Sequence, residues 1–232
     1  MQYQNLTLIG TSHIAKQSLK DVKDAIELGK PDIVCLELDP KRYYALLHNK
    51  KGKIRIYDIK RIGIKGFIFS LIGAWAEKKL GEAVGVTPGS EMIKAIKLSK
   101  KYKIRVSLID QDIELTLKKL NKSITWKERW NFVKDILKAI IFRKKEIEFD
   151  LTKVPEKKII DKLIKEVKQK YPNIYRVLVK ERNEFMAKNL ANLLNNNPDK
   201  KILAIVGAGH EEEMIKIIKK TKQDITYSYS LG

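Results

Sequence analysis

The sequence is poor in cysteine and in long apolar runs, and each shortage excludes a class of protein. Its 232 residues include a single cysteine, Cys35, so an internal disulfide framework is excluded and a reducing compartment such as the cytoplasm is expected. No stretch reaches the roughly 18 uninterrupted apolar residues of a membrane span. The first residues lead directly into a strand-like run, so we expect no signal peptide in them.

Positive charge, by contrast, is abundant. Lysine and arginine number 48 against 28 aspartates and glutamates, which gives a formal net charge of +20. The sequence pI near 9.8 is typical of nucleic-acid binders. The lysines are spread along the whole chain, however, as in the lysine-rich surfaces of hyperthermophile proteins. We therefore expect a compositional bias rather than a nucleic-acid partner.

Apolar runs of strand length alternate with amphipathic segments, which predicts an α/β fold. A hydrophobic content of 44% and the length suit one domain over residues 1–232. A strand, a helix and a second strand follow one another in the first forty residues, which implies a mostly parallel central sheet with flanking helices. A helical insertion is expected at about 112–172. The predicted strands are 6–10, 32–38, 105–110, 201–207 and a partly exposed last strand at 224–231.

The predicted helices differ in how clearly the sequence marks them. The segment 40–47 has proline in its first turn, and 211–220 has acids in its first turn and lysines in its last. The apolar segment 62–76 is too short and too broken for a span, so we expect a core or cleft-lining helix there. The remaining predicted helices are 18–29, 91–101, 112–120, 155–170 and 173–195.

The segment 118–145 stands out because it is strongly basic. It holds ten Lys or Arg residues against two Asp or Glu, together with Trp126 and Trp130. We expect a solvated helical subdomain whose tryptophans pack inward. The alternative is a patch that contacts a membrane surface or a nucleic acid.

Two of the three histidines, His13 and His210, occur in the same local setting. Each closes a GxxH motif that follows an apolar strand and precedes a helix. In an open parallel sheet, ligands bind outside the carboxyl ends of the strands. We therefore expect both imidazoles at that edge.

Carboxylates follow two other predicted strands. Glu37 and Asp39 come at the end of one, and Asp110 and Asp112 at the end of another. Imidazole and carboxylate together suit a divalent transition metal such as Mn, Co, Zn or Fe, and they also suit acid–base chemistry without a metal. Asp112 is expected to cap the following helix. Glu37 ends an apolar run, and a buried charge needs a partner.

Two arginines complete the set of candidates. Arg42 lies five residues beyond Glu37, and Arg182 shares a helix face with Leu178 and Met186 at four-residue spacing. That face predicts a buried guanidinium. A buried ion pair and a clamp for a substrate carboxylate or phosphate remain equally open. Signatures of P-loop enzymes, HExxH metalloproteases and GxSxG hydrolases are absent from the sequence.

The motifs, taken in order, resemble those of the TraB/PrgY family, whose name comes from a pheromone-shutdown protein. Its relatives include the TIKI metalloproteases and more remote erythromycin esterase-like and haem-binding ChaN-like proteins. The resemblance covers about residues 5 to 220. It is carried by GTSHIAKQS, PDIVCLELDPKRYYALL, VGVTPGSEM, SLIDQDIELTLKKL, VKERNEFMAKNL and IVGAGHEEEM.

The resemblance implies a site built from the two GxxH motifs and an acid. His13 and His210 match the GxxH histidines, while Glu37 and Arg42 match the ELD…R motif. Glu181 and Arg182 match the ERN motif, and Gln111 stands in a place that is often basic in the family.

We accordingly expect a metal-dependent hydrolase acting on peptide or protein substrates. His13, His210 and Glu37 would hold a divalent ion (Mn, Co or Zn) or act as acid–base groups. Arg42 and Arg182 would hold a substrate carboxylate or a developing oxyanion, and Glu181 would orient one arginine or a histidine. The alternative is a module that binds or sequesters a peptide without cutting it.

The resemblance also bears on the membrane. Many members carry C-terminal membrane helices, and this sequence stops soon after the second GxxH helix. A cytoplasmic protein and a membrane-anchored longer form therefore both remain open. In the second case the basic segment 118–145 would face an anionic membrane.

Overall fold

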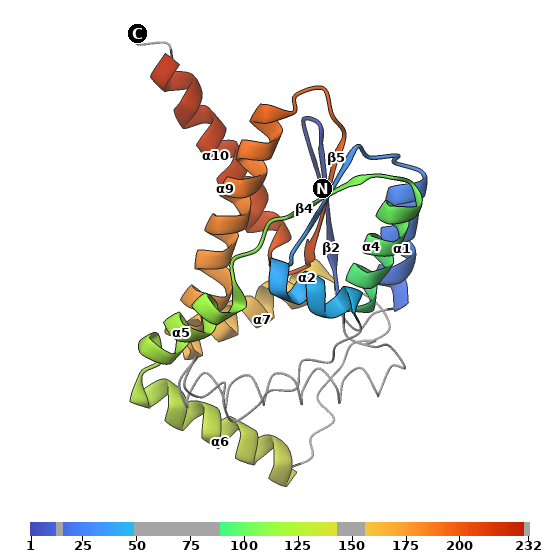
Figure 1. Ribbon diagram of the computed structural model, residues 1–232. Coiled ribbons are helices and arrows are strands. Elements are labelled where there is room, and N and C mark those ends of the chain that lie inside the picture. Colours follow the sequence, from blue (N-terminus) through green and yellow to red (C-terminus); the bar gives the residue numbers. More distant parts are fainter. Residues whose placement is uncertain (13–15, 49–88, 143–155, 230–232) are drawn as a thin grey trace.

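The described residues of this computed structural model are 1–12, 16–48, 89–142 and 156–229, and they surround a mixed sheet (Figure 1). The strand order is β1-β2-β5-β3-β4. The β1–β2 pair is antiparallel, and the other neighbours are parallel, so the predicted α/β fold with a mostly parallel sheet is confirmed. The strands are β1 (Gln2–Tyr3), β2 (Leu6–Thr11), β3 (Ile33–Leu36), β4 (Arg105–Leu108) and β5 (Ile202–Gly207).

The central strands are apolar along their whole length because helices cover both faces of the sheet. All four residues of β3 are buried, as are residues 202–206 of β5. Leu36 of β3 pairs with Ile205 of β5 and with Leu108 of β4, and Thr11 of β2 pairs with Gly207. This register brings the carboxyl ends of the parallel strands to one edge of the sheet.

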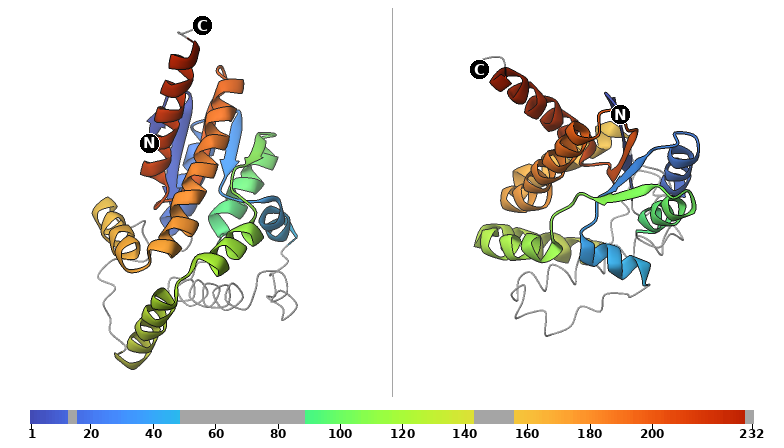
Figure 2. Two further views of the ribbon diagram at one scale, coloured as in Figure 1. Left: turned by 90° about the vertical axis from the view of Figure 1, so that its left-hand side faces the viewer. Right: turned by 45° about the horizontal axis from the view of Figure 1, so that its top comes forward.

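The helices form two outer layers (Figure 2). On one face, α9 (Glu181–Asn196) and α10 (Glu211–Tyr229) contribute Met186, Leu190 and Met214 to a core shared with the strands. On the other face, α1 (Lys16–Glu27) and α4 (Ser90–Lys101) contribute Val22 and Ile96 to a second core. The fold is therefore a three-layer sandwich.

The helix α2 (Pro40–Leu47) starts at the carboxyl edge of the sheet, and it has the bounds predicted from the sequence. Its N-cap is Asp39, whose side chain accepts hydrogen bonds from the backbone N–H groups of Lys41 and Arg42 at 2.8 and 3.1 Å. Proline at the first helical position needs no hydrogen-bond partner for its nitrogen. The end of β3 is thus turned sharply into a helix just after Glu37.

Further helices from the predicted insertion lie below the same edge in Figure 1. Their small core consists of Leu120, Ile124, Ile174 and Val177. The last of these elements, a π-helix, continues directly into α9. These elements are α5 (Ile113–Ser123), α6 (Trp126–Phe142), α7 (Lys157–Lys170), α8 (Pro172–Tyr175) and the π-helix η1 (Arg176–Lys180).

The expected inward packing of the tryptophans on α6 is wrong. Trp126 is 82% exposed and Trp130 is 65% exposed. The inward side of the helix is occupied by Glu128, which is 3% exposed and accepts hydrogen bonds from Thr125 and Asn173. A buried, fully bonded carboxylate thus takes the place in which the sequence suggested an indole.

The predicted last strand at 224–231 is also wrong, because α10 continues to Tyr229. No glycine or proline interrupts the helix after Glu211, and a short alternating run is insufficient to stop it. The predicted helix at 62–76 lies outside the described residues. In the part of the chain that the structure describes, none of the helices has the length and apolar character needed to cross a membrane.

Candidate functional site

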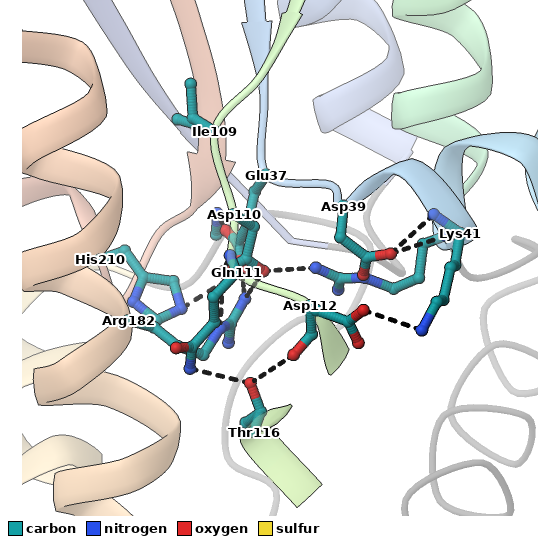
Figure 3. Close-up of polar contacts among 12 residues, drawn as sticks. Glu37, Asp39, Lys41, Ile109, Asp110, Gln111, Asp112, Thr116, Arg182 and His210 are labelled. Atoms are coloured by element: carbon teal, nitrogen blue, oxygen red, sulfur yellow. Dashed lines mark hydrogen bonds and ion pairs between the residues drawn. The ribbon is translucent and has the colours of Figure 1, made fainter. Parts of the chain in front are cut away.

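Glu37 is the centre of a polar cluster at the carboxyl edge of the sheet (Figure 3). It follows β3 directly and is 5% exposed. Its Oε2 accepts a hydrogen bond of 2.6 Å from the backbone N–H of Gly207 at the end of β5. Its Oε1 contacts Nη2 of Arg182 and lies 3.4 Å from Nε2 of His210. The structure therefore brings together three of the predicted site residues.

Both predicted arginines belong to a chain of alternating charges. Arg182 contacts Glu37 and also lies 2.6 Å from Oδ2 of Asp110. The same carboxylate contacts Arg42, whose Nε is 2.7 Å from Oδ2 of Asp39. Of the two roles left open by the sequence, the buried ion pair is the one observed. The two guanidinium groups hold the carboxylates of the cluster in place.

The charge of Arg182 is strongly favoured in this setting. Burial by itself would lower its pKa, but the carboxylates of Glu37 and Asp110 outweigh that effect and raise the pKa. Arg182 also donates to the backbone oxygen of Leu178, one turn earlier, at 3.2 Å. The guanidinium is therefore a fixed positive charge beside Oε1 of Glu37.

His210 is oriented by a second chain of hydrogen bonds. Its Nδ1 lies 2.6 Å from Oδ1 of Asn183, and Nδ2 of Asn183 donates to Oε2 of Glu213 at 2.8 Å. The Tyr175 hydroxyl donates to the same oxygen of Glu213 at 3.4 Å. Since Glu213 fixes the amide, we assign the proton of neutral His210 to Nδ1. The lone pair of Nε2 then faces Glu37.

The two GxxH motifs meet through their glycines. The backbone N–H of Ala208 donates to the oxygen of Thr11 at 2.9 Å, which joins the turn after β5 to the end of β2. A Cβ on Gly10 would lie only 2.9 Å from Cα of Ala208. Glycine is thus required for this close approach. His13, two residues beyond Thr11, lies outside the described residues.

Two other predicted acids have different surroundings. Glu181 pairs with Nζ of Lys119 at 2.8 Å and with Nε of Arg176 at 3.7 Å. Its role in orienting an arginine or histidine of the site stays a prediction. Asp112 caps α5 by accepting from the N–H of Glu114 at 2.7 Å, as expected from the sequence. Burial by itself would raise the pKa of Asp112, but the hydrogen bond from Lys41 lowers it.

Sequence reasoning missed Asn183, although a signal for it was present. Its side chain is fully buried, and it occupies the apolar stripe of α9 together with Ala187, Leu190 and Leu194. A polar residue inside such a stripe needs a buried partner. That partner is His210.

The geometry allows a test of whether a divalent ion fits. Among the described residues, no group of three or more His, Cys, Asp or Glu side chains could hold a metal ion. The pair of His210 and Glu37 has its facing donor atoms 3.4 Å apart. Two donors that bind one ion tetrahedrally at about 2.1 Å are about 3.4 Å apart. The two atoms are spaced as two ligands of one ion would be, although Oε1 of Glu37 also contacts Arg182, and His13, predicted as the third ligand, is not described.

Comparisons with known proteins agree with the motifs and the fold. A family model described as the TraB/PrgY/gumN family matches residues 2–224. The chain belongs to this family. The resemblance seen in the sequence is thereby confirmed, and the carboxyl-edge cluster of this TraB-family protein lies wholly within the matched region.

Individual relatives extend this result. An uncharacterized protein of Methanocaldococcus jannaschii is 38% identical over 224 residues, which are 93% of this chain and 54% of that protein. TraB domain-containing proteins of Bos taurus and Mus musculus are 23% and 22% identical over 191 residues, or 77% of this chain and 50% of each relative. The chain thus spans about half the length of the curated relatives it matches.

Proposed function

We propose that this TraB-family protein is a hydrolase that cuts peptide bonds with the help of a divalent transition metal, Mn, Co or Zn. The observation that carries the proposal is the meeting of His210 and Glu37 at the carboxyl edge, with Nε2 and Oε1 3.4 Å apart. An imidazole lone pair that faces a carboxylate is unfavourable unless a proton or a cation lies between them. Both occupants suit hydrolysis.

Each side chain of the cluster has a part in this reaction. His210 and Glu37, with His13, would hold the ion, which when bound lowers the pKa of a water molecule and polarises a carbonyl group. Glu37 keeps its Oε2 on the Gly207 N–H, so that Oε1 remains directed at the reacting groups. As a ligand of the ion, Oε1 would not serve as the base, and the proton of the attacking water would pass to solvent. Arg182 beside it would stabilise negative charge that develops on the oxygen of the attacked carbonyl group.

Of the roles expected for the arginines, a clamp on a substrate carboxylate is not part of this proposal. Because Arg42 and Arg182 are already paired with Asp39, Glu37 and Asp110, they position Glu37 instead of clamping a substrate carboxylate. If the two arginines position Glu37, another part of the protein must select the substrate.

Elemental analysis of the purified protein, together with cleavage of a peptide library with and without Mn²⁺, Co²⁺ or Zn²⁺, tests the proposal. We expect bound metal and metal-stimulated cleavage that is lost in Glu37→Gln and His210→Ala. The matched control is His48→Ala, since His48 is exposed at the end of α2 and should be dispensable. Absence of both bound metal and metal-stimulated cleavage would refute the proposal.

A second candidate is a module that binds a peptide without cutting it. The observation that favours it is the contact of Glu37 Oε1 with Arg182, which already satisfies the carboxylate. Peptide affinity that is unchanged by a chelator and by His210→Ala, in the absence of cleavage, would select this function over hydrolysis.

A further inference from the structure

A pocket opens directly beside His210. We infer that this pocket binds one apolar side chain of the substrate, next to the bond that is cut. The inference rests on the proposed hydrolase function and names what that site selects. The pocket has a volume of about 310 Å³, at the small end of the roughly 300–1,000 Å³ typical of ligand sites.

Apart from Thr11, Ser12 and His210, the described residues that line the pocket are apolar. Ile160 and Ile164 of α7 and Val179 of η1 form one side, and the turn at 207–210 forms the other. The polar group of Thr11 is already engaged, because its hydroxyl donates to the oxygen of Val206 at 3.2 Å. Among the described lining residues, His210 alone can carry a charge. A charged side chain in the pocket would therefore find no oppositely charged partner among the described lining residues, whereas an apolar one would contact the two isoleucines and Val179.

The helix over the pocket leaves its apolar side incompletely covered. None of the residues of α7 is buried, and Leu163 and Val167 are 44% and 37% exposed. An amphipathic helix normally buries its apolar stripe against a core. Here Ile160 and Ile164 face the pocket instead, so an apolar ligand would supply the missing contact.

A larger cavity of about 590 Å³ adjoins the pocket and shares Ile160, Ile164, Ala208 and Gly209 with it. Its rim differs from the pocket because it carries charges of both signs: Lys157, Asp161, Glu211, Glu212, Glu213 and Lys216. A groove with polar walls suits the backbone of a peptide, whose N–H and C=O groups need hydrogen bonds. The apolar pocket then receives the side chain at one point along it.

The position of His210 fixes which side chain this is. The same imidazole lines the pocket and faces Glu37 across 3.4 Å. A residue whose side chain enters the pocket therefore has its own peptide group beside the reacting pair. The pocket thus selects a residue that adjoins the scissile bond, with Ile164 as a specificity-determining residue.

Binding of single-residue amides tests this without requiring catalysis. N-acetyl-leucinamide and its charged analogue, the α-amide of N-acetyl-aspartic acid with a free side-chain carboxylate, are titrated into the full chain and followed by NMR. We expect the leucine compound to bind about tenfold more tightly or better. Ile164→Trp should fill the pocket and weaken leucinamide binding about tenfold or more. The matched control is Lys162→Trp, at an exposed position on the opposite side of the same helix, which should bind as the wild type does.

Ile164→Ala gives a second readout if the tryptophan variant fails to fold. It enlarges the pocket, so it should shift preference from N-acetyl-leucinamide towards N-acetyl-tryptophanamide. Equal binding of the leucine and aspartate compounds, or binding that Ile164→Trp and Lys162→Trp change alike, would overturn the inference. Selective binding together with a failure to cleave any peptide would refute the hydrolase and leave the pocket standing.

Discussion

Asn183 of α9 holds His210 of the turn after β5, with its Oδ1 2.6 Å from Nδ1 of the imidazole. Asn183→Leu removes this acceptor and lets the ring change its tautomer. We expect kcat/KM for peptide cleavage to fall about 10- to 100-fold, mainly through kcat, with a shifted pH profile. The comparison is Asn197→Leu at the far end of α9. Unchanged kinetics in a folded Asn183→Leu variant would contradict a positioning role.

Arg182 joins Glu37 to Asp110 and is itself mostly buried, with 15% of its side chain exposed. Arg182→Leu removes the guanidinium contact of buried Glu37 and one of the two guanidinium contacts of Asp110, so the free energy of unfolding should fall by about 3–5 kcal/mol. Arg182→Lys should cost roughly 1–3 kcal/mol, because an ammonium lacks the two-pronged geometry. Urea unfolding at neutral pH measures both.

The control for this series is Arg176→Leu. Its side chain is 50% exposed and lies 3.7 Å from Glu181. An exposed pair of this kind contributes about 0–1 kcal/mol. If Arg182→Leu were no more destabilising than Arg176→Leu, the buried charge chain would have no structural role.

The glycines of the two GxxH motifs should differ in their tolerance of a methyl group. In Gly10→Ala the new Cβ would meet Cα of Ala208 at 2.9 Å, and a backbone atom cannot easily move aside. We expect a loss of about 1–3 kcal/mol in thermal or urea unfolding. In Gly207→Ala the nearest atoms are His210 Cδ2 at 3.4 Å and Glu37 Oε2 at 3.5 Å. That variant should stay within about 1 kcal/mol of the wild type, and a reversed order would contradict the geometry.

Glu128 should make stability depend on pH. Burial by itself would raise its pKa, but hydrogen bonds from Thr125 and Asn173 lower the pKa below the usual 4.5. A carboxylate with a lowered pKa stabilises the fold above its ordinary value and loses that effect as the pH falls through the folded-state pKa. Glu128→Gln should therefore lower the free energy of unfolding by about 1–3 kcal/mol at neutral pH.

The difference in the free energy of unfolding between the wild type and Glu128→Gln should shrink towards zero as the pH falls well below 4.5. The wild-type carboxyl is then protonated and, like the glutamine, carries no charge. Urea unfolding of both proteins across this range measures it. If the difference in the free energy of unfolding stayed constant across this pH range, the charge on Glu128 would not contribute to stability.

The sequence was sufficient to predict where most of the cluster would assemble. Carboxylates and histidines placed just after apolar strands are brought to one edge by any parallel sheet, so Glu37 and His210 could be predicted together. Arg182 was recognisable because its position on an apolar helix face required a buried partner. The helix at Pro40–Leu47 was predicted with its observed bounds from the proline in its first turn.

The remaining features depend on contacts between distant segments. The partner of Arg182 could be Glu37 or a substrate, and only the packing of α9 against the sheet decides between them. Trp126 and Trp130 were expected inside because indole is largely apolar, yet Glu128 takes the inward side through bonds to Asn173. The last predicted strand failed because an uninterrupted helix prevails over a short alternating pattern.

The strand that follows all the others in the described chain, β5, lies between β2 and β3 in the sheet. During synthesis on the ribosome, β2 and β3 emerge long before they have the neighbour that joins them. Glu37 then lacks both the Gly207 N–H and His210, which arrive with β5 and the turn after it. The pairing of Glu37 with His210 can therefore form only once this late strand has been inserted between β2 and β3.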